Sequence, residues 1–162
     1  MRLARLLPLA VALALAVVAI SWIRTGNTDA GMALAAGLVA AHGFVHLLFL
    51  VRPPDTAAGG TQWPFDLDRS WLASGLHVDA GQLRAFGAGL AIVTAVACIV
   101  AGLATAGILL PPEAASRALT GAALASGLLL VTFFSQELVL GFAIDGWLVW
   151  LALASGWVPA IA

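Results

Sequence analysis

The stretch Ala30–Val51, AGMALAAGLVAAHGFVHLLFLV, decides the fold of this chain. It holds about twenty residues, enough for a helix to cross ~30 Å of hydrocarbon, and its only ionisable side chains are His42 and His46. Residues four apart on a helix project from one face, so the two imidazoles lie one above the other. Ionisable groups at membrane depth are costly and mark candidate functional sites. We therefore expect a membrane-spanning helix that carries a histidine pair.

The composition of the whole chain agrees with a membrane protein. Of its 162 residues, 62% are hydrophobic and only 9% are charged, where about a quarter of an average soluble domain is charged. The formal net charge of -1 offers no basic surface, so no nucleic-acid partner is expected. The single cysteine, Cys98, excludes an internal disulfide. The lipid bilayer is the predicted surrounding of this chain.

Apolar runs separated by Gly, Pro, Asn and Asp predict an all-α integral membrane bundle of five transmembrane helices in a single domain. The first run follows Arg2 and Arg5 and resembles a signal peptide, but Trp22 and Arg24 resemble an interfacial anchor and favour an uncleaved helix. Asp79 is the expected cap of the third helix. The predicted spans are about 3–23, 30–51, 82–110, 114–135 and 138–158, with a surface loop at 52–79.

Two segments of this prediction have alternatives. The aromatic and charged residues 63–72 indicate either a segment lying on the bilayer surface or a loop folded over the helix ends. Asp145 interrupts the last apolar run. Either Asp145 lies inside the membrane, or the last segment is re-entrant, because a helix beginning only at Trp147 is too short to span.

Arginine placement predicts the orientation. An amino terminus in the cytoplasm leaves only Arg24 and Arg117 outside, whereas the reverse orientation puts five arginines outside, against the positive-inside tendency. The chain is therefore expected to lie in the cell inner membrane with its carboxyl terminus external. The arginines expected in the cytoplasm are Arg2, Arg5, Arg52, Arg69 and Arg84.

Small residues recur four apart on three of the predicted helices. Such faces let helix backbones approach closely in lipid, so they favour a compact bundle, and they can equally bind another membrane subunit. They are Ala33/Gly37/Ala41, Gly102/Ala106, Gly121/Ala125 and Ala123/Gly127.

Counting ~1.5 Å per residue from the predicted helix ends places His46 and Asp145 in the same membrane layer, with His42 about one turn deeper. A metal ion gripped by His42 and His46 needs a further ligand, for which Asp145 is the first candidate. Glu137 and His77 are further candidates for the completing ligand, and together with Gln136 they are the candidate members of a polar network.

Three interpretations of these polar groups stay open. They are structural and fix the register of the bundle, or they hold haem or a transition metal, or they form a proton path. No signature of a soluble enzyme is present, and Ser70, Ser126 and Ser135 have no evident partner base. The favoured function is a non-enzymatic membrane component or accessory subunit. The alternatives are a membrane redox protein using His42 and His46, and a proton-coupled transport component.

The segment Ala41–Leu47, AHGFVHL, resembles the HGxxHL motif of a group of small, uncharacterised bacterial membrane proteins. The likeness extends over roughly 36–158 and includes the Ser135–Gln136 and Asp145–Gly146 pairs, but an FGxxxN-like segment usual in that group is missing. The resemblance implies the order of the helices and draws attention to His42, His46 and Gln136; it implies no activity.

Overall fold

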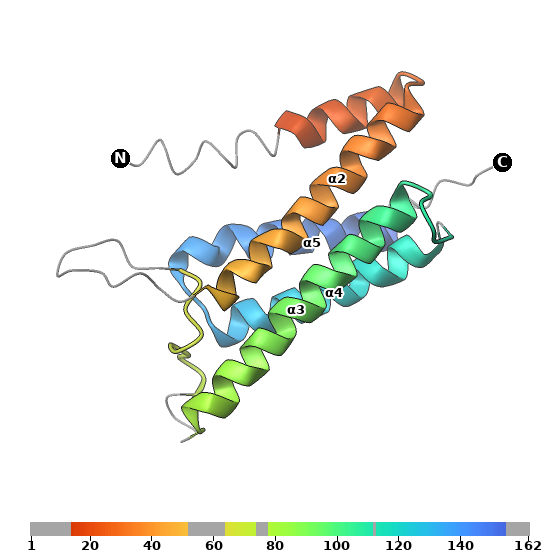
Figure 1. Ribbon diagram of the computed structural model, residues 1–162. Helices are drawn as coiled ribbons and strands as arrows, with labels where there is room; N and C mark the ends of the chain where they lie inside the picture. Colours follow the sequence, from red (N-terminus) through yellow and green to blue (C-terminus); the bar gives the residue numbers. More distant parts are fainter. Residues whose placement is uncertain (1–13, 52–63, 74–77, 112, 155–162) are drawn as a thin grey trace.

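A computed structural model of the chain describes residues 14–51, 64–73, 78–111 and 113–154, the last four by their backbone alone. All regular secondary structure in these ranges is helical, as predicted. The elements are a helix Ala14–Arg24, α2 Thr28–His46, the 3-10 helix η1 Leu47–Leu50, α3 Ala80–Thr105, α4 Glu113–Thr132, the 3-10 helix η3 Gln136–Leu138 and α5 Val139–Ala154. In Figure 1 the helices α2, α3, α4 and α5 lie side by side, and the red-orange helix that precedes α2 is set apart from them.

Glycines allow α2 and α3 to pack closely in opposite directions. A Cβ at Gly43 would lie 2.5 Å from Cys98 Cβ, and one at Gly102 would lie 2.8 Å from the carbonyl oxygen of Ala36. Neither glycine can carry a side chain without separating the helices. The predicted packing role of Gly102 is therefore confirmed, and Gly43, between the two histidines, has the same role.

The remaining helices follow the same antiparallel order. α4 packs against both α3 and α5. At the end of the bundle where α3 begins, Gly87 of α3 lies against both Leu67 of the preceding loop and Phe133, the residue after α4. Gly141 near the start of α5 lies against Leu130 of α4. Because neighbouring helices pack in opposite directions, the middle parts of α2, α4 and α5 lie at the same level and face the interior of the bundle.

The described part of the long loop, residues 64–73, folds over the helix ends, one of its two predicted arrangements. Ser70 Oγ donates a hydrogen bond of 2.7 Å to the carbonyl of Thr132, and Trp71 Nε1 donates one of 2.6 Å to the carbonyl of Val131. These are carbonyls in the last turn of α4 that have no partner within the helix. Asp79 caps α3 as predicted, with its Oδ1 accepting from the Gln82 amide at 3.0 Å.

Among the described residues, three helices are long and apolar enough to cross a membrane: Thr28–Leu50, Ala80–Thr105 and Glu113–Thr132. Of the predicted first span, the described part is the helix Ala14–Arg24, and residues 3–13 lie outside the described residues. α5 contributes 16 described residues and already begins at Val139, so Asp145 lies within a helix. The structure thus shows three candidate spans, while the count of five stays a prediction.

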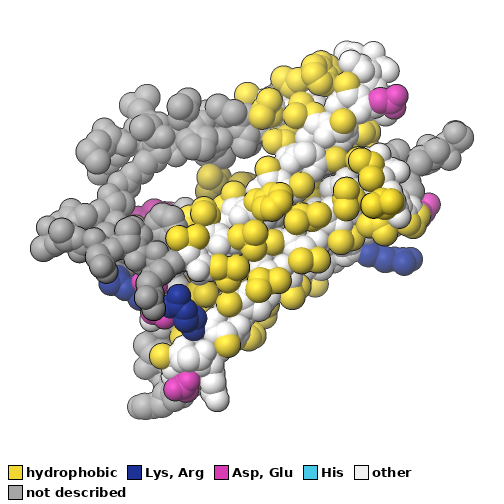
Figure 2. Space-filling model, in the orientation of Figure 1, with side chains coloured by type: hydrophobic (Ala, Val, Ile, Leu, Met, Phe, Trp, Pro, Cys, Tyr) yellow, Lys and Arg dark blue, Asp and Glu magenta, His cyan; other side chains and the backbone are white. Residues whose placement is uncertain are grey.

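The outer surface of the bundle is apolar between charged ends. Leu124 on α4 is 69% exposed, Phe44 on α2 is 56% exposed and Val93 on α3 is 55% exposed. Figure 2 shows hydrophobic side chains covering the length of the helices on the visible face, with acidic and basic side chains near their ends. A surface of this kind is unfavourable in water and suits hydrocarbon.

The other predicted small-residue faces differ in their burial. Ala33, Gly37 and Ala41 lie on the exposed side of α2, and Gly121 is exposed on α4. A Cβ at Gly37, Gly121 or Gly127 would meet nothing within 4 Å. The expectation of packing inside the bundle is therefore met at Ala123, which is buried on α4. It is not met at Ala33, Gly37, Ala41 and Gly121, because the buried sides of α2 and α4 are formed by other residues.

Candidate functional site

α2 presents His42 and His46 to the interior on successive turns. Their rings meet edge to face, with centroids 4.9 Å apart and an angle of 81° between the planes. His46 is only 4% exposed, and its Nδ1 lies 3.1 Å from the backbone carbonyl oxygen of His42. A carbonyl oxygen only accepts, so His46 Nδ1 carries the hydrogen, and Nε2 is directed away from this carbonyl.

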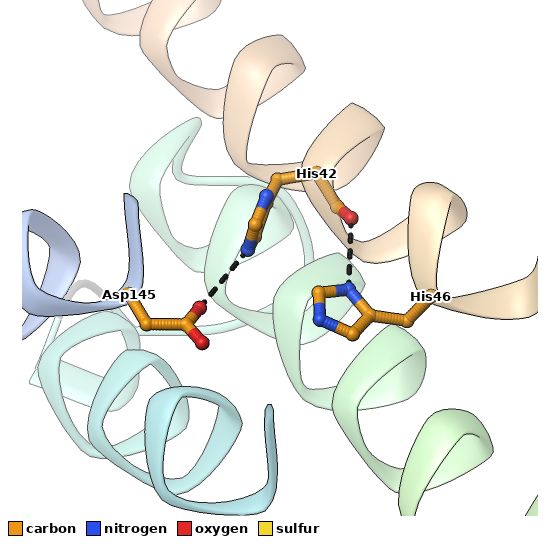
Figure 3. A group of neighbouring side chains, drawn as sticks. All are labelled: His42, His46 and Asp145. Atoms are coloured by element: carbon orange, nitrogen blue, oxygen red, sulfur yellow. Dashed lines mark hydrogen bonds and ion pairs between the residues drawn. The ribbon is translucent and has the colours of Figure 1, made fainter. Parts of the chain in front are cut away.

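Asp145 reaches the same place from α5. Its Oδ1 lies 3.1 Å from His42 Nε2, and the residue is 5% exposed. Figure 3 shows the two imidazoles and the carboxylate converging from α2 and α5. The structure therefore brings together the three residues singled out from the sequence as a metal set: His42, His46 and Asp145.

Ser126 of α4 completes the cluster. Its Oγ lies 2.5 Å from Asp145 Oδ2 and 2.7 Å from His46 Nε2, and it is fully buried. With the His46 contact to the His42 carbonyl, four hydrogen bonds form a closed circuit across α2, α4 and α5. We call these four side chains the polar cluster: His42, His46, Ser126 and Asp145.

Hydrogen counting sets the charge of the polar cluster. Four contacts need four hydrogens, and the ring nitrogens of neutral His42 and His46 with the Ser126 hydroxyl supply three. The fourth is carried either by Asp145 as a carboxylic acid or by His46 as a cation beside the Asp145 carboxylate. The net charge of the cluster is zero in both cases, which keeps the cost of placing it in a low-dielectric interior small.

The donor atoms of the polar cluster are those of a metal site. One ligand atom each from His42, His46 and Asp145 lies within 4.8 Å of the other two. Imidazole nitrogen and carboxylate oxygen are the usual ligands of zinc and of other first-row transition metals. These three residues are thus the ones in the described part of the chain that could hold an ion.

The other predicted polar residues lie elsewhere. Gln136 and Glu137 are exposed in η3. Asp145 is eight residues beyond Glu137, about 12 Å along a helix, so the structure does not bring the two into the polar cluster. His77 lies outside the described residues. The predicted wider network is therefore reduced to the residues of α2, α4 and α5.

Sequence reasoning missed Ser126, for which no partner base was evident. The signal was its position in the apolar run of α4, on the same face as Ala115, Leu119, Ala122 and Leu129, all of which are buried. A hydroxyl on the packed face of a membrane helix needs a partner from another helix, because lipid supplies none.

Searches for similar proteins gave no match to this chain among family models, curated proteins or solved structures. The resemblance of Ala41–Leu47 to the HGxxHL group stays a prediction from the motif.

Proposed function

We propose that this chain is a non-enzymatic membrane component, an accessory subunit whose helices are locked in register by the polar cluster. The observation that carries the proposal is the closed circuit of four hydrogen bonds linking α2, α4 and α5. A buried polar group without a partner is costly, whereas each bond across membrane helices contributes roughly 0.6–2 kcal/mol. A one-residue slip of any of these helices breaks the circuit, so the cluster selects one arrangement.

The contacts of Ser126 do not fit a role as a catalytic nucleophile. In a serine–histidine–aspartate triad the carboxylate orients the histidine through Nδ1, and the serine hydroxyl faces the substrate. Here the carboxylate of Asp145 contacts the serine itself, and His46 Nδ1 is bound to a backbone carbonyl. Ser126 is also 0% exposed. The cluster therefore has the connectivity of a structural network, with no position for a substrate beside the hydroxyl.

The outer side of α2 supports an accessory role. Ala33, Gly37 and Ala41 form an exposed row of small residues that the bundle itself does not use. A helix of another membrane subunit can approach such a row closely, and van der Waals contact then favours association in lipid. The proposed partner of this chain is accordingly a membrane subunit that packs against α2.

The proposed placement is the cell inner membrane, crossed five times, with the amino terminus cytoplasmic and the carboxyl terminus external. Its support is the arginine distribution in the sequence and the apolar outer surface of α2, α3 and α4. The resemblance to the HGxxHL group agrees with a small membrane protein of several spans.

The test compares two outward glycines. Gly37 lies on α2 and Gly89 on α3, and both are exposed with no atom within 4 Å of an added Cβ. We expect the native protein, extracted in mild detergent, to run as a complex of fixed stoichiometry by native mass spectrometry. Gly37→Leu should release the chain from this complex, and Gly89→Leu should not.

Two results would overturn the proposal. A wild-type chain that is extracted alone is not an accessory subunit. A complex that persists in Gly37→Leu, with the same composition as in Gly89→Leu, excludes α2 as the contact face.

A further inference from the structure

The polar cluster brings together three side chains that can each offer a ligand atom to the same ion. The donor atoms of His42, His46 and Asp145 lie within 4.8 Å of one another. Around a four-coordinate ion with bonds of about 2.0–2.1 Å, ligand atoms are ~3.4 Å apart. The largest separation thus has to shrink by at most ~1.4 Å for the three atoms to share one ion.

The outer contacts of the cluster match those of metal ligands. A metal-binding histidine usually donates its other ring N–H to a carbonyl or carboxylate, which fixes the tautomer and aims the free nitrogen. His46 does this through Nδ1, which donates to the His42 carbonyl at 3.1 Å and leaves Nε2 directed toward Ser126 and Asp145. Ser126 Oγ in turn holds Asp145 Oδ2 and orients the carboxylate.

From these contacts we infer that His42 Nε2, His46 Nε2 and Asp145 form a binding site for one divalent transition-metal ion. This role is separate from the accessory function and requires no partner subunit. Ser126 is a positioning residue that holds the carboxylate. Three protein ligands leave one coordination position for a water molecule or another small ligand.

The chemistry of the donors selects the class of ion. Two imidazoles and one carboxylate suit zinc, cobalt, nickel, copper or ferrous iron, whereas calcium and magnesium prefer oxygen ligands alone. Haem is a poorer fit. His42 and His46 project from the same face of α2 with ring centroids 4.9 Å apart, so they cannot bind opposite sides of one macrocycle.

The test uses Zn²⁺ and Co²⁺ with the full chain purified in detergent. After incubation and desalting we expect one ion per chain by elemental mass spectrometry. We also expect visible d–d absorption of bound Co²⁺, with X-ray absorption of the zinc form showing two imidazoles and oxygen ligands. The chain's third histidine supplies the matched control, so His77→Ala should bind as the wild type does.

The near-isosteric variants His46→Gln and Asp145→Asn should lose at least 100-fold in affinity, whereas Ser126→Ala, which removes only an orienting contact, should lose about 10- to 100-fold. Circular dichroism verifies that each variant is folded. If a variant does not fold, the X-ray absorption spectrum of the wild type decides. A wild type that retains no ion, a spectrum without imidazole, or loss of binding in His77→Ala overturns the inference. None of these results bears on the complex released by Gly37→Leu.

Discussion

His42 Nε2 lies 3.1 Å from Asp145 Oδ1, a contact between residues 103 positions apart in the chain. It joins the second described helix to the last one. α2 packs chiefly on α3, and α5 packs chiefly on α4. The His42–Asp145 contact therefore closes the bundle between two helices that have few other contacts, and Ser126 extends this closure to α4.

Removal of the Asp145 side chain is expected to break the contact between α2 and α5 and to destabilise the bundle. Asp145→Ala leaves His42 Nε2 without its partner and the Ser126 hydroxyl with His46 as its remaining partner, at a cost of roughly 1–3 kcal/mol. Thermal unfolding in detergent, followed by circular dichroism, should show a clear decrease in Tm. The control is Asp29→Ala, an exposed carboxylate in the first turn of α2, which should cost less than about 1 kcal/mol. Equal Tm values for the two variants would contradict a structural role of the cluster.

Ser126 and Ser135 provide a second matched pair of variants. Ser126 makes hydrogen bonds to His46 and Asp145, whereas the buried Oγ of Ser135 has no partner among the described residues. Ser126→Ala should therefore destabilise the protein by about 1–2 kcal/mol, and Ser135→Ala should leave its stability unchanged or slightly raised. Chemical denaturation of the two variants side by side measures the difference. A larger loss in Ser135→Ala would show that the hydroxyl of Ser135 has the more important contact.

The helices and the candidate histidines could be predicted from the sequence because each depends on local pattern. The length of the apolar run 30–51 predicts a helix, and its i,i+4 spacing puts His42 and His46 on one face. Counting from helix ends also predicted that His46 and Asp145 lie at similar depth. Depth carries no information on direction, however, and the structure was needed to show that Asp145 contacts His42 and reaches His46 through Ser126.

Which of the small residues lie at helix contacts could not be predicted from their spacing. Ala33, Gly37 and Gly102 have equivalent spacing patterns, yet only Gly102 lies at a helix contact inside the bundle. Which side of a membrane helix faces protein depends on tertiary packing, because lipid is as apolar as the interior and leaves no strong polar–apolar contrast in the sequence.

The close approach of α2 and α3 predicts a steric effect at Gly43. Gly43→Ala places a methyl group 2.5 Å from Cys98 Cβ and 3.0 Å from the Ala95 carbonyl oxygen, so the helices must separate, at a cost of about 1–3 kcal/mol. Gly37→Ala, on the open side of α2, should be neutral or stabilising. Unfolding midpoints of the two variants measure the contrast.

The double variant Gly43→Ala/Cys98→Gly provides the control for this mechanism. Removal of the Cys98 side chain relieves the closer of the two contacts, so the double variant should be more stable than the sum of the single effects predicts. Strict additivity would mean that the cost at Gly43 has another origin.

The loop over the helix ends is expected to contribute to stability through one leucine. Leu67 is 3% exposed and packs with Phe133 against Gly87, whereas Leu72 in the same loop is 43% exposed. Leu67→Ala should cost roughly 2–5 kcal/mol, and Leu72→Ala less than about 1 kcal/mol. Limited proteolysis together with Tm measures both. Similar values for the two variants would indicate that the loop is not docked on α3 and α4.

The proposed orientation in the membrane predicts opposite accessibility for two arginine positions separated by α3. Arg69 lies in the loop before this helix and Arg117 in α4 after it, and both are exposed. α3 has 26 residues, about 39 Å of helix, which suffices to cross the bilayer. In a Cys98→Ala background, Arg117→Cys should react with a membrane-impermeant maleimide added to intact spheroplasts, and Arg69→Cys should react only after permeabilisation. Reaction of both from the same side would show that α3 does not cross, and the reversed pattern would place the amino terminus outside, against the positive-inside tendency on which the orientation depends.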